Sequence, residues 1–212
     1  KIAMRDLSIR GAGNILGASQ SGFIDSVGFE MYSQLLEEAI NKRQGKTQVR
    51  RKGNAEFNLQ IDAYLPSDYI SDERQKIEIY KRIREIENQK DYRDLQDELI
   101  DRFGEYPDQV AYLIEIGLVK AYLDAAFAEL VERKNDTIIV RFEKASLKFF
   151  LTQDYFEAIS KTHLKAKISD NQGKVEITFD VRNKKDYEIL EELKIFGQTF
   201  MEIKERKEKK EA

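Results

Sequence analysis

A change in hydrophobic period near residue 137 is the feature that most constrains how this chain can fold. Before it, apolar residues recur every three or four positions, and after it they alternate with polar residues, so helices precede a part rich in strands. One further alternating segment lies before the helices. The predicted elements are a strand over 57–66, helices from Ser71, over about 91–103 and from Pro107 to about Leu130, a strand over 137–143, a helix over 152–162, a hairpin over 164–181 that turns at "DNQG", and a helix over about 184–206. This order predicts an α+β domain with a small, mostly antiparallel sheet.

The N-terminal part of the chain has a different character. A Gly-rich loop, "IRGAGNILGASQSGF" at 9–23, precedes a segment whose apolar spacing predicts a helix that ends near Gly45. We therefore divide the chain into the segments 1–45 (Gly-rich loop and helix), 46–55 (basic linker), 56–206 (α+β domain) and 207–212 (a tail expected to fray). The sequence begins at Lys1 without an initiator Met, and we expect it to be part of a longer protein.

Charge is distributed unevenly along the chain. The net charge is −3, but residues 1–53 carry nine Lys and Arg against five Asp and Glu, whereas residues 54–212 carry 27 against 34. Within "KRQGKTQVRRK" at 42–52 there are six cations and no carboxylate. Such a stretch attracts nucleic-acid phosphate, and the candidate DNA contacts are Lys42, Arg43, Lys46, Arg50, Arg51 and Lys52. A solvated linker that happens to be basic is the competing interpretation.

Composition argues against a metal centre or a membrane anchor. The chain has no Cys and a single His, His163, so it offers neither a disulfide nor a thiolate metal site, and no metal ligand is predicted. No run of about 18 apolar residues occurs and no signal peptide is recognised, so we expect no membrane contact and a cytoplasmic location.

The motifs of nucleotide binding and catalysis are not matched. Gly11, Gly13 and Gly17 follow a polar segment, and their spacing departs from the dinucleotide-binding fingerprint. Gly17 is followed by Ala and Ser, so it does not end a phosphate-binding loop, which needs Gly-Lys-Ser/Thr. Paired carboxylates such as Glu191 and Glu192 fall on faces expected to be solvated. We predict no catalytic residue and no cofactor in this chain.

The opening segment nevertheless resembles a known motif. "MRDLSIRGAGNILGASQSGFIDSVGFEMYSQLLEEAI" at 4–40 is similar to the translocation motif of the RecG family of DNA translocases, and its second half resembles the version found in bacterial transcription-repair coupling factors (Mfd). Two later stretches resemble the C-terminal domain of the same family, in the same order: "YLPSDYISDERQKIEIYKRIREI" at 64–86 and "ELIDRFGEYP" at 98–107. Beyond about residue 130 only the pattern agrees.

This resemblance implies a role within a larger enzyme. The family uses ATP and Mg to translocate on double-stranded DNA, releases RNA polymerase stalled at lesions and recruits nucleotide-excision repair. The nucleotide-binding motifs would lie upstream, so the intact parent is expected to be a helicase-type hydrolase and this chain alone is not. The C-terminal domain would dock onto the parent's own UvrB-like N-terminal domain and mask its UvrA-binding surface, which makes it autoinhibitory.

The resemblance also assigns roles to the Gly-rich segment. Arg10 and Gln20 would couple the ATPase centre to movement on DNA, since a guanidinium makes planar multi-donor contacts and a carboxamide both donates and accepts. The residues expected to shape this loop are Asp6, Gly11, Gly13, Asn14, Gly17 and Gly22. A structural ion pair between Arg10 and Asp6 is the alternative for Arg10.

A function of another class competes with autoinhibition. The α+β domain would then be a constitutive docking module for a separate repair or transcription protein. The two hypotheses differ in what the acidic surface of this domain binds: the parent's own N-terminal domain or a separate partner.

Overall fold

The computed structural model of this chain describes residues 52–212, which form two compact units. The first unit comprises residues 62–117, and the second comprises residues 52–61 and 118–212. Helix α6 (Asp108–Ala125) contributes to both, because the division falls after Gly117. The Gly-rich loop, the helix predicted after it and most of the basic stretch lie outside the described residues.

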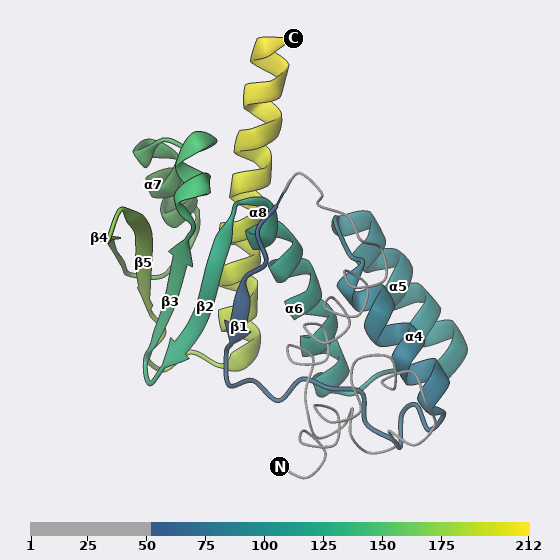
Figure 1. The fold of residues 1–212 in the computed structure, drawn as a ribbon. Helices are drawn as coiled ribbons and strands as arrows, with labels where there is room; N and C mark the ends of the chain where they lie inside the picture. The colour runs from purple at the N-terminus through teal and green to yellow at the C-terminus, as the bar shows by residue number, and fades with distance from the viewer. Residues whose placement is uncertain (1–51) are drawn as a thin grey trace, which may run out of the picture. The chain divides into compact units, whose positions relative to one another are not determined.

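Helices build the first unit (Figure 1). Its own two helices are α4 (Glu73–Arg84) and α5 (Gln89–Phe103), and α6 adds its N-terminal part. Asp72 caps α4 and Asn88 caps α5, since each side chain accepts a hydrogen bond from the backbone N–H three residues further on, at 2.9 Å. Gly104 ends α5 with a φ of +82°, as the sequence predicts.

The core of the first unit lies between these helices and the loop that precedes them. Its buried apolar residues are Leu65, Ile70, Ile79, Tyr80, Ile83, Ile86, Leu95, Leu99, Val110, Leu113, Ile114 and Ile116. The hydroxyl of Tyr80 accepts a hydrogen bond from the backbone N–H of Leu65 at 3.0 Å, which attaches the loop to α4. Gly117 lets α6 approach α4 closely, because a Cβ at this position would lie 2.8 Å from Cγ2 of Ile83.

A five-stranded sheet is the frame of the second unit, with the strand order β1-β2-β3-β5-β4. The strands are β1 (Glu56–Asn58), β2 (Ala128–Lys134), β3 (Thr137–Phe142), β4 (Ala166–Asn171) and β5 (Lys174–Asp180). β1 runs parallel to β2, and the other three pairings are antiparallel. The predicted α+β class with a small, mostly antiparallel sheet is therefore confirmed for the described residues.

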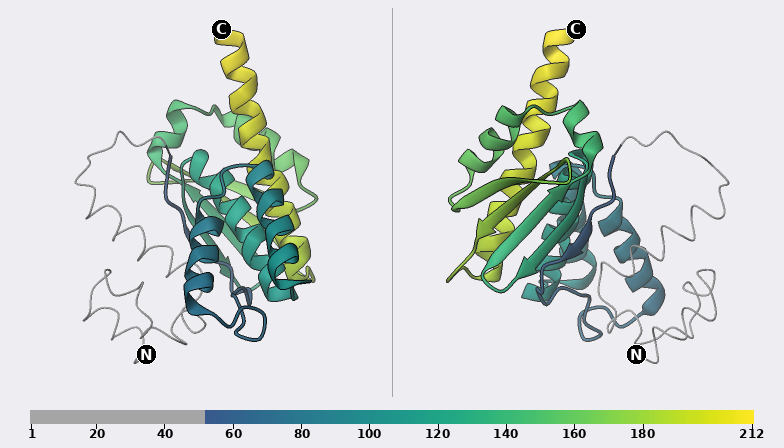
Figure 2. Two further views of the ribbon diagram at one scale, coloured as in Figure 1. Left: turned by 90° about the vertical axis from the view of Figure 1, so that its right-hand side faces the viewer. Right: turned by 60° about the vertical axis from the view of Figure 1, so that its left-hand side comes forward.

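One long helix covers a face of this sheet (Figure 2). This helix is α8 (Asp186–Glu211), and its C-terminal turns extend beyond the sheet (Figure 1). Phe196 of α8 meets Phe179 of β5 edge-on, with ring centroids 5.0 Å apart. The 3-10 helix η3 (Lys144–Lys148) and α7 (Thr152–Lys161) follow β3, and α7 packs against α8 through Tyr155 and Phe200. Aromatic packing between α7, α8 and the inner sheet face thus forms the core of the second unit.

The strand predicted over 57–66 is wrong beyond Asn58. Phe57, Leu59 and Leu65 are buried, as the alternation requires, but only Glu56–Asn58 pair with β2. Gln60 has a φ of +56°, which turns the backbone out of the extended region and ends the strand.

The helix predicted to reach about Leu130 is also wrong at its end. α6 stops at Ala125, and Ala128 begins β2, a strand that the sequence analysis missed. Phe127 makes the reversal with a φ of +61°, a conformation usually taken by Gly. At the other end of the domain, α8 continues to Glu211 instead of ending near 206.

Candidate functional site

The negative charge of the described domain lies in the first unit. Residues 62–117 carry fifteen Asp and Glu against eight Lys and Arg, whereas residues 118–212 carry 18 against 19. The second unit is therefore nearly neutral, and the acidic excess of the domain belongs to the helices α4 and α5 and their loops. A partner attracted by this charge must be basic.

Four carboxylates form a stripe along α5. Asp94, Asp97, Glu98 and Asp101 occupy positions i, i+3, i+4 and i+7, which lie on one face of a helix. We call these four residues the α5 stripe. Ile100, three residues after Asp97, is 40 % exposed and borders the stripe, so an apolar side chain lies beside the carboxylates.

Two arginines hold one member of the stripe in place. The Glu98 carboxylate contacts the Arg82 guanidinium on α4, and Oε2 of Glu98 lies 3.8 Å from Nη1 of Arg102. Arg102 also donates to Oε1 of Glu78 at 3.1 Å, across the same pair of helices. These side chains are between 31 and 51 % exposed, so the pairs fix orientation more than they stabilise the fold. The two family-like stretches meet in this cross-helix network.

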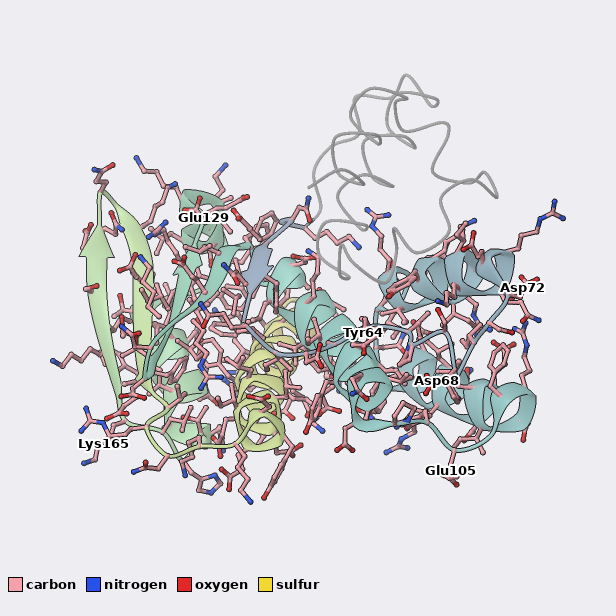
Figure 3. All side chains as sticks on the ribbon, turned by 90° about the horizontal axis from the view of Figure 1, so that it is seen from below. Tyr64, Asp68, Asp72, Glu105, Glu129 and Lys165 are labelled. Carbon is pink, nitrogen blue, oxygen red and sulfur yellow. The ribbon has the colours of Figure 1, made fainter. Side chains whose placement is uncertain are left out.

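The loop before α4 is attached to the end of α5. The Tyr69 hydroxyl donates to the carbonyl oxygen of Gly104 at 2.9 Å, and the ring packs edge-on against Phe103. Burial, with smaller contributions from Tyr106 and Glu105, raises the pKa of Tyr69, so it stays a neutral donor. Figure 3 labels further carboxylates on the loops that flank α4 and α5, namely Asp68, Asp72 and Glu105. The loops that flank α4 and α5 therefore carry carboxylates as well.

A buried ion pair organises the start of the second unit. Nζ of Lys120 lies 2.9 Å from Oδ2 of Asp124, one helical turn later in α6, and the two side chains are only 14 and 11 % exposed. Lys120 also donates to Oδ1 of Asn54 and to the carbonyl oxygen of Ala55, both at 3.0 Å. Oδ1 of Asp124 accepts from the backbone N–H of Ala55 at 2.7 Å. These contacts, which we call the anchor, join the segment before β1 to α6.

Burial raises the pKa of Asp124, against the opposing effects of Lys120, the Ala55 N–H and the charge of Lys52. Gly53 strengthens the attachment, since its N–H donates to the Asp124 carbonyl oxygen at 2.7 Å. A side chain at Gly53 would lie 2.9 Å from the carbonyl oxygen of Ala128, so only Gly fits. The anchor positions a chain segment, and its geometry serves structure rather than proton transfer.

Most of the predicted site residues lie outside the described residues. This applies to Arg10, Gln20 and the six loop-shaping residues, and to five of the six candidate DNA contacts. The sixth, Lys52, is exposed and directly precedes the anchor. The anchor itself was missed, although Lys120 and Asp124 are the only charges between residues 116 and 128 and are spaced by four.

Glu192 does not lie on a solvated face, contrary to the prediction for this carboxylate pair. Its side chain is 12 % exposed and accepts from the backbone N–H of His163 at 2.7 Å. The imidazole of His163 lies 3.0 Å from the same carboxylate but is 80 % exposed. Within residues 52–212, His and carboxylate side chains form no group of three or more that could hold a metal ion. Nor does that part of the chain contain a helix long and apolar enough to cross a membrane.

The fold and these charged surfaces define a two-unit α+β domain with an acidic helical face. Comparison with known proteins identifies the family of this domain. The profile of the TRCF domain matches residues 59–152. The transcription-repair-coupling factor of Bacillus subtilis (strain 168) is 50 % identical over 138 residues, which are 65 % of this chain and 12 % of that protein. The corresponding Staphylococcus aureus (strain USA300) protein is 41 % identical over 184 residues, which are 86 % of this chain and 16 % of that protein.

A solved structure agrees with the sequence comparison. The crystal structure of the C-terminal domain of a transcription-repair coupling factor superimposes with a TM-score of 0.73 at 64 % identity, covering 76 % of this chain and 99 % of that one. The chain belongs to the transcription-repair coupling factor family, and its described part corresponds to the C-terminal domain. The resemblance of the two later stretches is thereby confirmed. The chain spans less than a fifth of the length of the curated relatives that it matches.

Proposed function

We propose that this chain is the regulatory C-terminal part of an ATP-dependent DNA translocase and that the α5 stripe docks onto the parent's UvrB-like N-terminal domain. Docking would mask the UvrA-binding surface until the parent engages a stalled RNA polymerase. The observation that carries this proposal is the concentration of the domain's negative charge in residues 62–117, with four carboxylates on one helix face. The parent protein in this proposal is a transcription-repair coupling factor, because the chain belongs to that family.

Physical reasons favour the α5 stripe over other charged surfaces of the domain. The arginines beside Glu98 orient its carboxylate before any partner arrives, which lowers the entropy lost on docking. Asp97 and Asp101 are exposed and stay available for partner cations. The 40 % exposed Ile100 at the edge of the stripe adds a small apolar contact to the electrostatic selection. Such a surface suits reversible docking within one protein.

The test uses the full-length parent with Asp97→Lys and Asp101→Lys combined. These changes reverse two exposed charges and spare Glu98, so the cross-helix ion pairs persist. UvrA binding and basal ATPase activity should both rise, as they should when residues 56–212 are deleted. Glu205→Lys, at an exposed position of α8, reverses one carboxylate charge in the second unit and should have no effect. Unchanged UvrA binding in the double variant would refute docking through the stripe.

The N-terminal segment has a separate proposed role in motor coupling, through Arg10 and Gln20, with ATP and Mg bound by the upstream motor. Arg10→Ala or Gln20→Ala in the parent should abolish movement on double-stranded DNA while DNA-stimulated ATP hydrolysis continues. Loss of ATP hydrolysis together with movement would contradict a coupling role. Direct DNA binding by the basic stretch predicts an affinity for DNA that falls steeply with salt.

A further inference from the structure

The positive charge of the second unit is concentrated around the hairpin of β4 and β5. Residues 118–212 are almost neutral, with 19 Lys and Arg against 18 Asp and Glu, but residues 161–185 carry seven against three. Four of these seven cations are exposed lysines at one end of the sheet, and we call them the lysine cluster: Lys165, Lys167, Lys184 and Lys185. A local excess of one charge in a neutral unit attracts a partner of the opposite charge.

Hydrogen bonds of the backbone bring the two halves of the lysine cluster together. The carbonyl oxygen of Lys165, just before β4, accepts from the N–H of Asp180, the last residue of β5, at 2.8 Å. The loop 181–185 begins at this point, and the N–H of Lys184 donates back to the carbonyl oxygen of Val181 at 3.0 Å. Figure 3 labels Lys165 at this end of the sheet. The cluster therefore surrounds the place where β4 begins and β5 ends.

Two of the four lysines lie on the sheet face that α8 leaves uncovered. Lys167 pairs with Thr178 of β5, and successive residues of a strand point to opposite faces. The next residue of β5, Phe179, packs against Phe196 of α8 and so points to the covered face. Lys167 and, two residues earlier, Lys165 therefore point away from α8, onto the open face of the sheet (Figure 2).

The ammonium groups of the cluster are free, whereas the carboxylates near them already have donors. None of the four side chains forms an ion pair or a hydrogen bond with another side chain in residues 52–212. Oδ1 of Asp180 accepts from the N–H of Arg182 at 2.9 Å, and Oε2 of Glu188 accepts from the N–H of Lys185 at 2.8 Å. The positive charge of the cluster is therefore available to a partner.

The chemistry of this surface favours phosphate over a protein partner. Protein interfaces depend on large apolar or aromatic anchors, and none of the exposed large apolar side chains of the described residues lies between 161 and 185. A lysine contacts phosphate as a point charge and, in doing so, reads no base. Duplex DNA presents a dense array of phosphates, one charge per about 1.7 Å of its axis. We propose that the lysine cluster binds the phosphate backbone of duplex DNA, independently of base sequence.

This contact is separate from the α5 stripe and from the basic stretch 42–52. The stripe is acidic and belongs to the first unit, whereas the cluster belongs to the second unit. UvrA binding by the parent tests the stripe, and DNA binding by this chain tests the cluster. Either proposal can therefore fail while the other holds.

The test measures binding of the 212-residue chain to a duplex of about 20 base pairs by fluorescence anisotropy at several salt concentrations. Replacing all four lysines of the cluster by Gln should weaken binding. It should also reduce the slope of log affinity against log salt by up to about 3.6, because each phosphate contact contributes about 0.9. Between about 50 and 200 mM salt, the wild type should then lose up to roughly 150-fold more affinity than the variant.

A matched control removes the same number of charges elsewhere in the second unit. Its four exposed lysines, all replaced by Gln, are Lys144, Lys148, Lys209 and Lys210. This control variant should keep both the affinity and the salt slope close to those of the wild type, and urea unfolding curves show that both variants are folded. Equal losses in the two variants, or an unchanged slope in the cluster variant, would overturn the proposal.

A competition experiment distinguishes DNA from an acidic protein surface. Poly-glutamate at the same concentration of charge should displace the labelled duplex less well than unlabelled duplex does. Amide chemical shifts of residues 165–167 and 182–185 should change when the duplex is added. Equal displacement by poly-glutamate, or shift changes confined to other residues, would refute binding of duplex DNA by the cluster.

Discussion

Replacing Lys120 by Met removes one member of a buried ion pair and keeps most of its apolar stem. Asp124 would then retain the Ala55 N–H as its hydrogen-bond donor but lose its nearest counter-charge. Breaking a buried pair by removing one partner costs about 3–5 kcal/mol, because the remaining charge is desolvated without compensation. The chain contains a matched control. Lys90 and Asp94 are the same residue types at the same spacing, with side chains 82 and 53 % exposed.

Lys90→Met should therefore cost under about 1 kcal/mol, the usual upper value for a surface pair. Urea unfolding followed by circular dichroism and tyrosine fluorescence measures both variants at about pH 7, well above the ordinary Asp pKa. The direction of the pH effect follows from burial. Burial raises the pKa of Asp124 in the folded chain. Below the unfolded pKa of about 3.9 the carboxyl is protonated in both states, so its charge costs no free energy of unfolding. This cost grows as the pH rises through the pKa of the folded chain.

The difference in free energy of unfolding between wild type and Lys120→Met should therefore become smaller as the pH is lowered toward 4. Similar losses for Lys120→Met and Lys90→Met would refute the reasoning, because burial is the difference between the two pairs. A gap that does not change with pH would refute the assignment of the penalty to the Asp124 carboxylate.

Two further predictions concern the second unit. Gly197→Ala should destabilise the chain by about 1–3 kcal/mol in thermal or urea unfolding, because the new Cβ would lie 2.8 Å from the Cβ of Tyr122. Ala ordinarily favours a helix over Gly, so a stabilised variant would contradict this close contact. Glu176 has its pKa lowered by a hydrogen bond from Asn171 and by Arg141, so its contribution to stability is present above the ordinary Glu pKa and is lost as pH falls. Glu176→Gln should make the free energy of unfolding less dependent on pH on the acid side of neutrality. An unaltered pH dependence would count against the pairing of Glu176 with Asn171 and Arg141.

The sequence predicts those elements whose ends carry local signals. α5 stops at Gly104, and the hairpin of β4 and β5 turns at "DNQG" with Gln172 and Gly173 at positive φ. The end of α6 has no such signal, because Phe127 occupies the position where Gly is usual. Stacking on Phe149, which is 22 residues away in the sequence, offsets the cost of that conformation. A contact of this kind cannot be seen in a local window, so β2 was missed.

The candidate surfaces were predictable to different degrees. The spacing of Asp94, Asp97 and Asp101 is visible in the sequence, but many other charged residues have similar spacing. Only the contacts between α4 and α5, Arg82 with Glu98 and Glu78 with Arg102, distinguish this face. The exposure of Leu147, Phe149, Leu151 and Phe156 could not be predicted, because apolar residues at alternating positions do not reveal which of them face inward when a 3-10 turn interrupts the period.

The most direct test of the account is calorimetric binding of this chain, in trans, to the parent's isolated UvrB-like N-terminal domain, with UvrA as competitor. The account predicts saturable binding that UvrA displaces and that is lost when Asp97→Lys and Asp101→Lys are combined. Binding that persists in this double variant, or that UvrA does not displace, would contradict docking of the α5 stripe onto the UvrA-binding surface.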